Sequence, residues 1–207
     1  AEMVDNLREL GIKVVVVKGP KSIADVKENV KLIAKTLGEE DKGNLMIAKM
    51  DDKLAEIKEK VDNIKPEERK KLVLISLMTS YGGKGCTFDD ICQYAGVING
   101  VSDAGLHNGQ LLTKEMLVAI NPDLLIMPVY NDHNTFDIEK YNKEFLDDPA
   151  LQTLNAVKEK RFFYPREGYI YNSSQDIVFG VQEVARAAYG ELFSQPENCH
   201  ISVAEIN

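Results

Sequence analysis

The sequence predicts an α/β fold, in which a lobe with a mostly parallel sheet flanked by helices follows a long connector helix and one isolated strand. From about residue 70 onward, short apolar runs typical of buried strands alternate with segments of helical period, as in parallel α/β sheets. Before residue 66, apolar residues recur at steps of three and four, the pattern of amphipathic helices. These observations indicate one complete lobe, a connector and the edge of another lobe.

The N-terminal segment predicts a short helix over Met3–Leu10 and an apolar strand over Gly11–Lys18. The strand contains four consecutive valines, but the nearby sequence supplies no neighbouring strand for it. We therefore expect residues 1–21 to be the remnant of an N-terminal lobe. Because an uncovered strand edge recruits other strands, residues 12–18 are also expected to allow association with a second copy of the chain.

Residues 22–65 are predicted to form the connector as two consecutive helices. Ser22 is a suitable N-cap with Asp25 at the capping-box distance, and Gly38 is expected to end the first helix. The second helix is expected to run to about Asn63. At ~1.5 Å per residue, more than twenty helical residues span over ~30 Å. This helix is therefore long enough to bridge two lobes.

Residues 66–195 are predicted to form the C-terminal α/β lobe, and residues 196–207 a peripheral tail. The run Asp123–Pro128 is almost continuously apolar, as in parallel strands that are covered on both faces. The expected strands are Lys71–Met78, Asp123–Pro128 and Arg161–Tyr164. The expected helices are Thr87–Ala95, Thr113–Ile120, Pro149–Lys160 and Ser173–Phe193.

The composition excludes several classes of function. A formal net charge of −8 argues against a nucleic-acid partner, because phosphate binding needs a basic face. No stretch approaches the ~18 consecutive apolar residues of a membrane span, so the protein is expected to be peripheral to a membrane at most. The three cysteines form no C-x-x-C pair and are expected to be buried free thiols.

Neither a nucleotide site nor catalysis is supported by a motif. In the glycine-rich segment 82–87, Lys84 is followed by glycine, so the spacing of a phosphate-binding P-loop is not met. The three histidines, His107, His133 and His200, belong to no recognised metal or nucleophile spacing. We therefore expect a protein that is not an enzyme and has no cofactor or resident metal.

Three loops follow the expected strands, and ligands bind at the carboxyl ends of strands in such sheets. They cover residues 79–86, 129–134 and 165–172, and each contains Tyr together with Asn, Gly or both. Tyrosine offers an apolar face with a hydrogen-bonding tip, and glycine allows close approach of the backbone. The loops therefore suit a bulky, partly apolar ligand better than a single small ion.

From about Asn6 to Leu192, the order and spacing of these segments resembles the substrate-binding proteins of bacterial iron-siderophore, haem and cobalamin ABC importers. In that family, two lobes are joined by one long helix. Residues 10–26 are similar to the family's last N-lobe strand and its turn into the connector, and residues 83–96 to its glycine-rich loop and the helix that follows. Residues 112–126 and 151–163 are the other similar segments.

The resemblance implies an extracytoplasmic binding protein, periplasmic or lipid-anchored, that captures a metal chelate between two lobes and delivers it to an ABC permease with its ATPase. A ferric siderophore or haem is the expected ligand, since Lys84 and Arg166 suit an anionic chelate. Tyr171 stands where cobalamin-binding relatives have a base, which argues against cobalamin. Glu115 matches the glutamate that contacts permease arginines. The residues expected to line the cleft are Tyr81, Lys84, Tyr130, Asn131, His133, Arg166, Glu167, Tyr169 and Tyr171.

A second interpretation keeps the fold and changes the role. The long helix carries mixed charges at helical spacing, among them Lys53, Lys58 and Glu56. The chain could then be a stand-alone interaction or regulatory domain that docks a protein partner through this charged helix.

Overall fold

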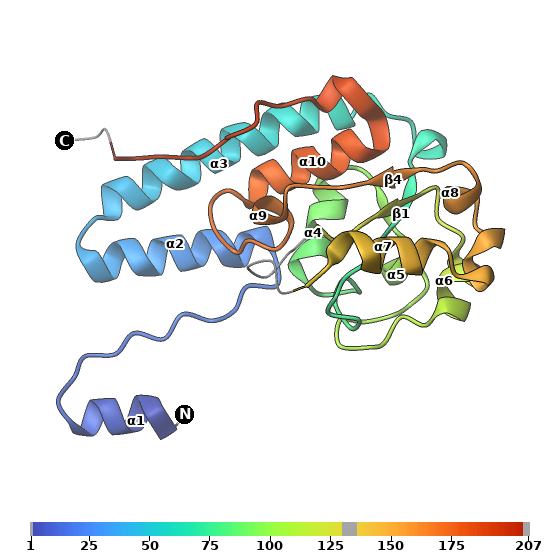
Figure 1. Cartoon of the computed structure of the whole chain (residues 1–207). Helices are drawn as coiled ribbons and strands as arrows, with labels where there is room; N and C mark the ends of the chain where they lie inside the picture. The colour runs from blue at the N-terminus through green and yellow to red at the C-terminus, as the bar shows by residue number, and fades with distance from the viewer. Residues whose placement is uncertain (1, 130–135, 205–207) are drawn as a thin grey trace.

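The computed structural model describes residues 2–129 and 136–204 (Figure 1). The helices in this part of the chain are α1 (Glu2–Glu9), α2 (Ile23–Leu37), α3 (Glu40–Val61), α4 (Thr87–Tyr94), α5 (Gly100–Asp103), α6 (Lys114–Ile120), α7 (Ile138–Leu146), α8 (Asn155–Lys158), α9 (Glu167–Ile170) and α10 (Ile177–Tyr189). Short 3-10 helices are η1 (Pro66–Glu68), η2 (Pro149–Thr153) and η3 (Gly190–Phe193). The strands are β1 (Lys71–Leu74), β2 (Ile98–Asn99), β3 (Leu124–Ile126) and β4 (Phe162–Phe163).

The four strands form one sheet in the order β2-β1-β3-β4, and every neighbouring pair is parallel. In the register, Leu72 is opposite Leu124, and Leu125 is opposite Phe162. The predicted α/β class with a parallel sheet is confirmed. The strands are shorter than expected, because the hydrogen-bonded pairing between neighbouring strands extends over only two to four residues of each. Strand β2 was not among the expected strands.

Helices cover both faces of the sheet, because alternate strand residues are apolar on each side. Leu72, Leu74 and Ile126 pack into a core shared with α3, α4 and α10. Val73 and Leu125 pack into a second core on the opposite face, with residues of α6, η2 and α8. The sheet is thus buried on both sides, as its nearly continuous apolar runs predict.

The connector is a pair of adjacent helices, α2 and α3 (Figure 1). The Ser22 hydroxyl accepts a hydrogen bond from the Asp25 N–H, and Gly38 ends α2 with φ of 70°, so both predicted caps are confirmed. Gly43, in the first turn of α3, lies where this helix approaches α2. The structure requires it, because a Cβ there would lie 2.4 Å from the Ala34 Cβ.

The long helix α3 packs along the lobe, against α10 and α4, through one apolar face. Met50, Leu54 and Ile57 of this face are buried. On the solvent side, Glu56 pairs with both Lys53 and Lys60. One glutamate of the helix thus neutralises two of its lysines.

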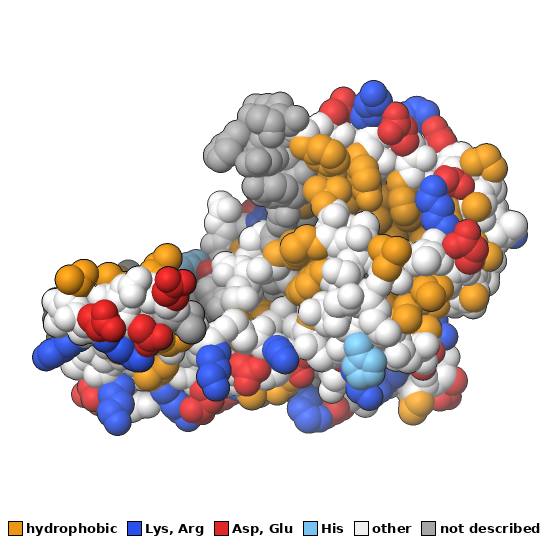
Figure 2. Space-filling model, turned by 90° about the horizontal axis from the view of Figure 1, so that it is seen from below, with side chains coloured by type: hydrophobic (Ala, Val, Ile, Leu, Met, Phe, Trp, Pro, Cys, Tyr) orange, Lys and Arg blue, Asp and Glu red, His pale blue; other side chains and the backbone are white. Residues whose placement is uncertain are grey.

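Residues 12–20 contain neither helix nor strand, so the strand expected at Gly11–Lys18 is not formed. A strand is held by hydrogen bonds to a neighbour, and no strand of the described chain lies beside this segment. Its side chains are open to solvent, with exposed fractions of 49% for Val15 and 54% for Val16. Figure 1 shows the segment and α1 leading away from the lobe, and the view from below shows apolar side chains among charged ones at both ends of the molecule (Figure 2).

Three further regions differ from the expected elements. Helix α7 was missed, and the helix expected at Pro149–Lys160 is divided at Leu154 into η2 and α8. The last helix begins at Ile177, four residues after the expected start. The C-terminal tail was expected to be peripheral, but Ile201 is only 6% exposed and its N–H donates to the Asp176 carboxylate at 2.9 Å.

Candidate ligand-binding surface

The carboxyl end of β1 continues into the glycine-rich loop that contains Tyr81. The Tyr81 hydroxyl lies 2.9 Å from the Thr87 hydroxyl. Its ring centroid is 5.5 Å from that of Tyr171, which follows α9. Burial is the main cause that raises the pKa of Tyr81 to about 12. The phenol therefore stays protonated near neutral pH and can donate a hydrogen bond.

Close packing against residues 106–108 fixes the path of this loop. Lys84 N–H donates to the Leu106 carbonyl at 2.9 Å, and Asn108 N–H donates to the Lys84 carbonyl at 3.0 Å. A Cβ at Gly83 would lie 2.7 Å from the backbone carbon of His107. Only glycine fits at position 83 without displacing the neighbouring backbone.

Two buried polar side chains hold the loop from beneath. The Asn99 Nδ2 donates to the Gly82 carbonyl at 2.8 Å and to Asp89 Oδ1 at 3.0 Å, while its Oδ1 accepts from the Val101 N–H. The Asp89 Oδ2 in turn accepts from the Gly85 N–H at 3.3 Å. Neither residue was predicted from the sequence. The available signal was an asparagine directly before a short helix, which is a common N-cap.

A hollow of about 190 Å³ lies where the glycine-rich loop, the segment after α9 and the start of the connector meet. Of the predicted site residues, Tyr81 and Tyr171 line it. Pro20, Lys21 and Thr87 also contribute to its wall. Aromatic faces, a lysine and a hydroxyl group therefore converge at one place, a combination suited to a partly apolar ligand with an anionic group.

The segment around α9 carries the next group of predicted residues. Arg166 is half-buried and lies 3.7 Å from the carboxylate of Glu197 in the tail. Tyr169 is buried, packs against Phe179, and donates its hydroxyl to the Cys199 carbonyl at 2.7 Å. Tyr169 therefore lies in the core and supports this segment from behind, because its hydroxyl is already bonded to the tail.

The remaining predicted residues are distributed as follows. Lys84 is exposed but does not line the hollow, and Glu167 is the first residue of α9. Tyr130, Asn131 and His133 lie outside the described residues.

Glu115, the predicted contact for a permease, is exposed in the first turn of α6. A hydrogen bond from its own backbone N–H, followed by one from the Thr113 hydroxyl, holds the pKa of Glu115 below its ordinary value. Because α6 leads to the amino end of β3, its first turn lies at the same end of the sheet as the ligand loops. The Glu115 carboxylate is thus charged and accessible near that surface.

The connector is fixed to the lobe close to the hollow. The Ile23 N–H, in the first turn of α2, donates to Asp90 Oδ2 of α4 at 2.7 Å. Burial raises the pKa of Asp90, and this bond opposes that effect. The bond sets the point at which the connector leaves the lobe.

The described residues hold no cluster of three metal-ligating side chains. Cys86 and Cys92 are buried free thiols, as expected, and burial raises the pKa of both. Cys199 was expected to be buried as well, but it is only partly buried. None of the helices in the described ranges is long and apolar enough to cross a membrane.

The structure thus combines a parallel sheet, loops at its carboxyl edge and an adjoining pair of helices, α2 and α3. Residues 3–167 match the periplasmic binding protein family, and the chain belongs to that family. This is a class of binding proteins and not of enzymes. The resemblance found in the sequence is thereby confirmed.

Individual relatives agree with this assignment. The chain is 25% identical over 201 residues to an uncharacterized ABC transporter substrate-binding lipoprotein, YvrC, of Bacillus subtilis (strain 168). That alignment covers 94% of the chain and spans 60% of the length of the relative.

Two solved structures share the fold. The periplasmic haem-binding protein RhuT of Roseiflexus sp. RS-1, in its apo form, superposes with a TM-score of 0.77 at 19% identity, over 91% of this chain and 71% of that one. The structure of an ABC-type Fe3+-hydroxamate transport system from Saccharomonospora viridis DSM 43017 superposes with a TM-score of 0.69 at 18% identity. This superposition covers 90% of this chain and 64% of that one.

Proposed function

We propose that the chain provides the connector and C-terminal lobe of the solute-binding component of an ABC importer. Its ligand is a metal chelate, either a ferric siderophore or haem. Residues 1–21 belong to the N-terminal lobe in this proposal, residues 22–65 to the connector, residues 66–195 to the C-terminal lobe and residues 196–207 to the tail. The location is extracytoplasmic, and the partners are the permease and its ATPase.

The observation that carries the proposal is the hollow lined by Tyr81 and Tyr171 at the carboxyl edge of the sheet. The two tyrosine rings, tilted by 37° to each other, provide apolar contact area together with hydrogen-bonding groups. Lys84 is exposed and directly precedes Gly85 of the hollow's lining. It has no ion pair within the described ranges and can meet a carboxylate or catecholate. The relatives named above bind haem or transport a Fe3+-hydroxamate according to their descriptions, which supports this ligand class.

Tyrosine fluorescence gives a direct test, because the chain contains no tryptophan. Titration with ferric siderophores, haemin and cobalamin should quench the emission with one of the first two and not with cobalamin. Tyr171→Ala should weaken binding, whereas Tyr94→Ala, an exposed tyrosine outside the hollow, should not. Failure of every chelate to bind a preparation that contains both lobes would reject the ligand class.

Permease docking through Glu115 needs a separate test. Glu115→Arg should reduce uptake of the ligand by cells that express the importer, with ligand affinity unchanged. Glu191→Arg is the matched control, because Glu191 is also exposed but lies in η3, at the C-terminal end of α10. Equal uptake by the Glu115→Arg and Glu191→Arg variants would remove the docking role.

A further inference from the structure

The tail, described over residues 196–204, turns back from η3 and reaches the connector helix α3 (Figure 1). Gln182 of α10, which is 2% exposed, holds the turn by donating its Nε2 to the Ser194 carbonyl at 2.9 Å. At the far end, Lys49 of α3 donates its Nζ to the Ser202 carbonyl at 2.7 Å. The tail is therefore a fixed part of the fold, although its described residues contain neither helix nor strand.

The tail is bonded to both ends of the segment that carries Tyr171. At one end, the Tyr169 hydroxyl donates to the Cys199 carbonyl at 2.7 Å. At the other end, Asp176 Oδ1 accepts a hydrogen bond from the Ile201 N–H at 2.9 Å. Tyr171 lies between these two anchors and lines the hollow, whereas no described residue of the tail does. The tail therefore acts on this wall of the hollow through the backbone and not by direct contact.

The carboxylate of Asp176 is used by the tail and not by its own helix. Asp176 is the N-cap residue of α10, a position where an aspartate commonly accepts a hydrogen bond from the first turn. Its side chain forms no such bond. Instead, Oδ1 is bonded to Ile201, and Oδ2 lies 2.6 Å from His200 Nδ1. The side chain is only 13% exposed, so these contacts with the tail are largely shielded from water.

The segment between the two anchors has little regular structure of its own. Helix α9 ends before it and α10 begins after it, and residues 171–176 contain neither helix nor strand. Asn172 and Ser173 are exposed. An irregular, exposed segment opens more easily than a helix or strand, so its position depends strongly on the bonds at its ends.

We propose that the tail is a strap that positions the Tyr171 wall of the hollow, with Tyr169 and Asp176 as the positioning residues. While the tail is bound, the Tyr171 ring is held 5.5 Å from that of Tyr81, measured between centroids. Release of the tail from either anchor lets the segment move away from the glycine-rich loop and widens the hollow. The strap itself does not depend on the transport function, whereas its effect on ligand affinity rests on that proposed function.

A single tryptophan can report on this wall, because the chain contains none. Tyr171→Trp places the reporter in the wall, and acrylamide quenching of its fluorescence measures its accessibility without any ligand. Adding Asp176→Ala should raise the quenching constant roughly twofold, because the released segment opens to solvent. Adding Asp176→Asn should restore most of the protection, since the amide oxygen still accepts from the Ile201 N–H. The matched control is Asp137→Ala, which removes the N-cap of α7 and should leave the quenching constant unchanged.

Tyr169→Phe tests the other anchor, because it removes only the hydroxyl that is bonded to the tail. In the chain that carries the reporter, it should raise the quenching constant in the same direction as Asp176→Ala. Its matched control is Tyr189→Phe. The Tyr189 hydroxyl also donates to a backbone carbonyl, but that carbonyl belongs to Gly96, outside the tail.

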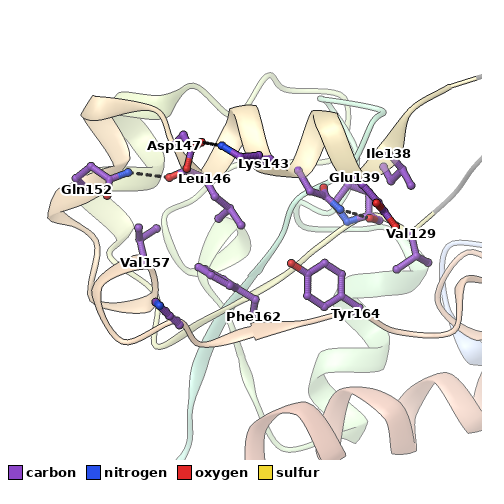
Figure 3. Close-up of a pocket in the computed structure, with 13 residues that line it drawn as sticks. Val129, Ile138, Glu139, Lys143, Leu146, Asp147, Gln152, Val157, Phe162 and Tyr164 are labelled. Carbon is purple, nitrogen blue, oxygen red and sulfur yellow. Dashed lines mark hydrogen bonds and ion pairs between the residues drawn. The ribbon is translucent and has the colours of Figure 1, made fainter.

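A second reporter separates movement of this wall from loosening of the whole lobe. Phe162→Trp lies in the groove between α7 and β4 (Figure 3), and Phe162 packs in the core on the opposite face of the sheet from Ile201. The quenching constant of this reporter should be the same with and without Asp176→Ala.

The proposal is overturned if neither tail variant changes the quenching of the first reporter, or if the control variants change it as much. An equal response of the two reporters would overturn it as well, because the lobe as a whole would then have loosened. If Asp176→Ala does not fold, the comparison of Tyr169→Phe with Tyr189→Phe decides.

Discussion

Removing the Asn99 side chain should destabilise the lobe strongly, because this buried side chain connects the glycine-rich loop with α4 and α5. Asn99→Ala deletes the bonds to the Gly82 carbonyl and to Asp89 Oδ1 and leaves the Val101 N–H without its cap. An N-cap contributes about 1 kcal/mol, and hydrogen bonds contribute about 0.5–1.5 kcal/mol, or more when one partner is charged. The expected loss is about 2–4 kcal/mol of the free energy of unfolding.

Urea unfolding followed by far-UV circular dichroism measures this loss, and thermal unfolding should show a Tm lower by roughly 5–15 °C. Asn63→Ala is the matched control. It removes the same side chain from an exposed position where Nδ2 bonds only to the Glu59 carbonyl, so its effect should stay within about 0.5 kcal/mol. Equal stabilities of the Asn99→Ala and Asn63→Ala variants would refute the structural role of Asn99.

Three further outcomes are expected. Gly83→Ala should lower the free energy of unfolding by about 1–3 kcal/mol in urea, since the added Cβ would meet the His107 backbone. Gly168→Ala, with no atom within 4 Å of the added Cβ, should have little effect. Equal losses of unfolding free energy in the two variants would contradict this reasoning. With a pKa raised from 10.0 to about 12, Tyr81 contributes stability that is complete below pH 10 and lost as the pH rises towards 12. Alkaline titration of phenolate absorbance should therefore lose its latest step in Tyr81→Phe, and an unchanged titration would reject the assignment. Self-association through residues 12–18 should appear as a dimer in light scattering and vanish in Val16→Lys; a monomeric unaltered chain would dismiss it.

The helices were the most predictable part of the structure, because their signals are local. The stripe of apolar residues in α3 is the face that is buried, and Ser22 and Gly38 cap α2 as their positions in the sequence indicate. Helix α7 has apolar residues at Ile138, Tyr141 and Phe145, which is the same kind of signal, yet it was missed because it directly follows a polar loop.

The candidate site was predictable only in outline. The rule that ligand loops follow parallel strands selected Tyr81 and Tyr171, and the structure brings both residues to one hollow. Their role in ligand binding stays a prediction. The rule could not distinguish them from Tyr169, because the burial of that ring depends on contacts with Phe179 and with the Cys199 carbonyl in the tail.

The sequence by itself determined the α/β class, the two connector helices and the family resemblance, because apolar periodicity, caps and segment order are properties of neighbouring residues. Only the tertiary structure decided the rest. It left residues 12–18 without a strand partner, brought Asn99 beneath Gly82, and bound the tail to Asp176. Each of these outcomes depends on which distant backbone groups meet, and the pairing of hydrogen-bond donors and acceptors across the fold is not encoded in local pattern.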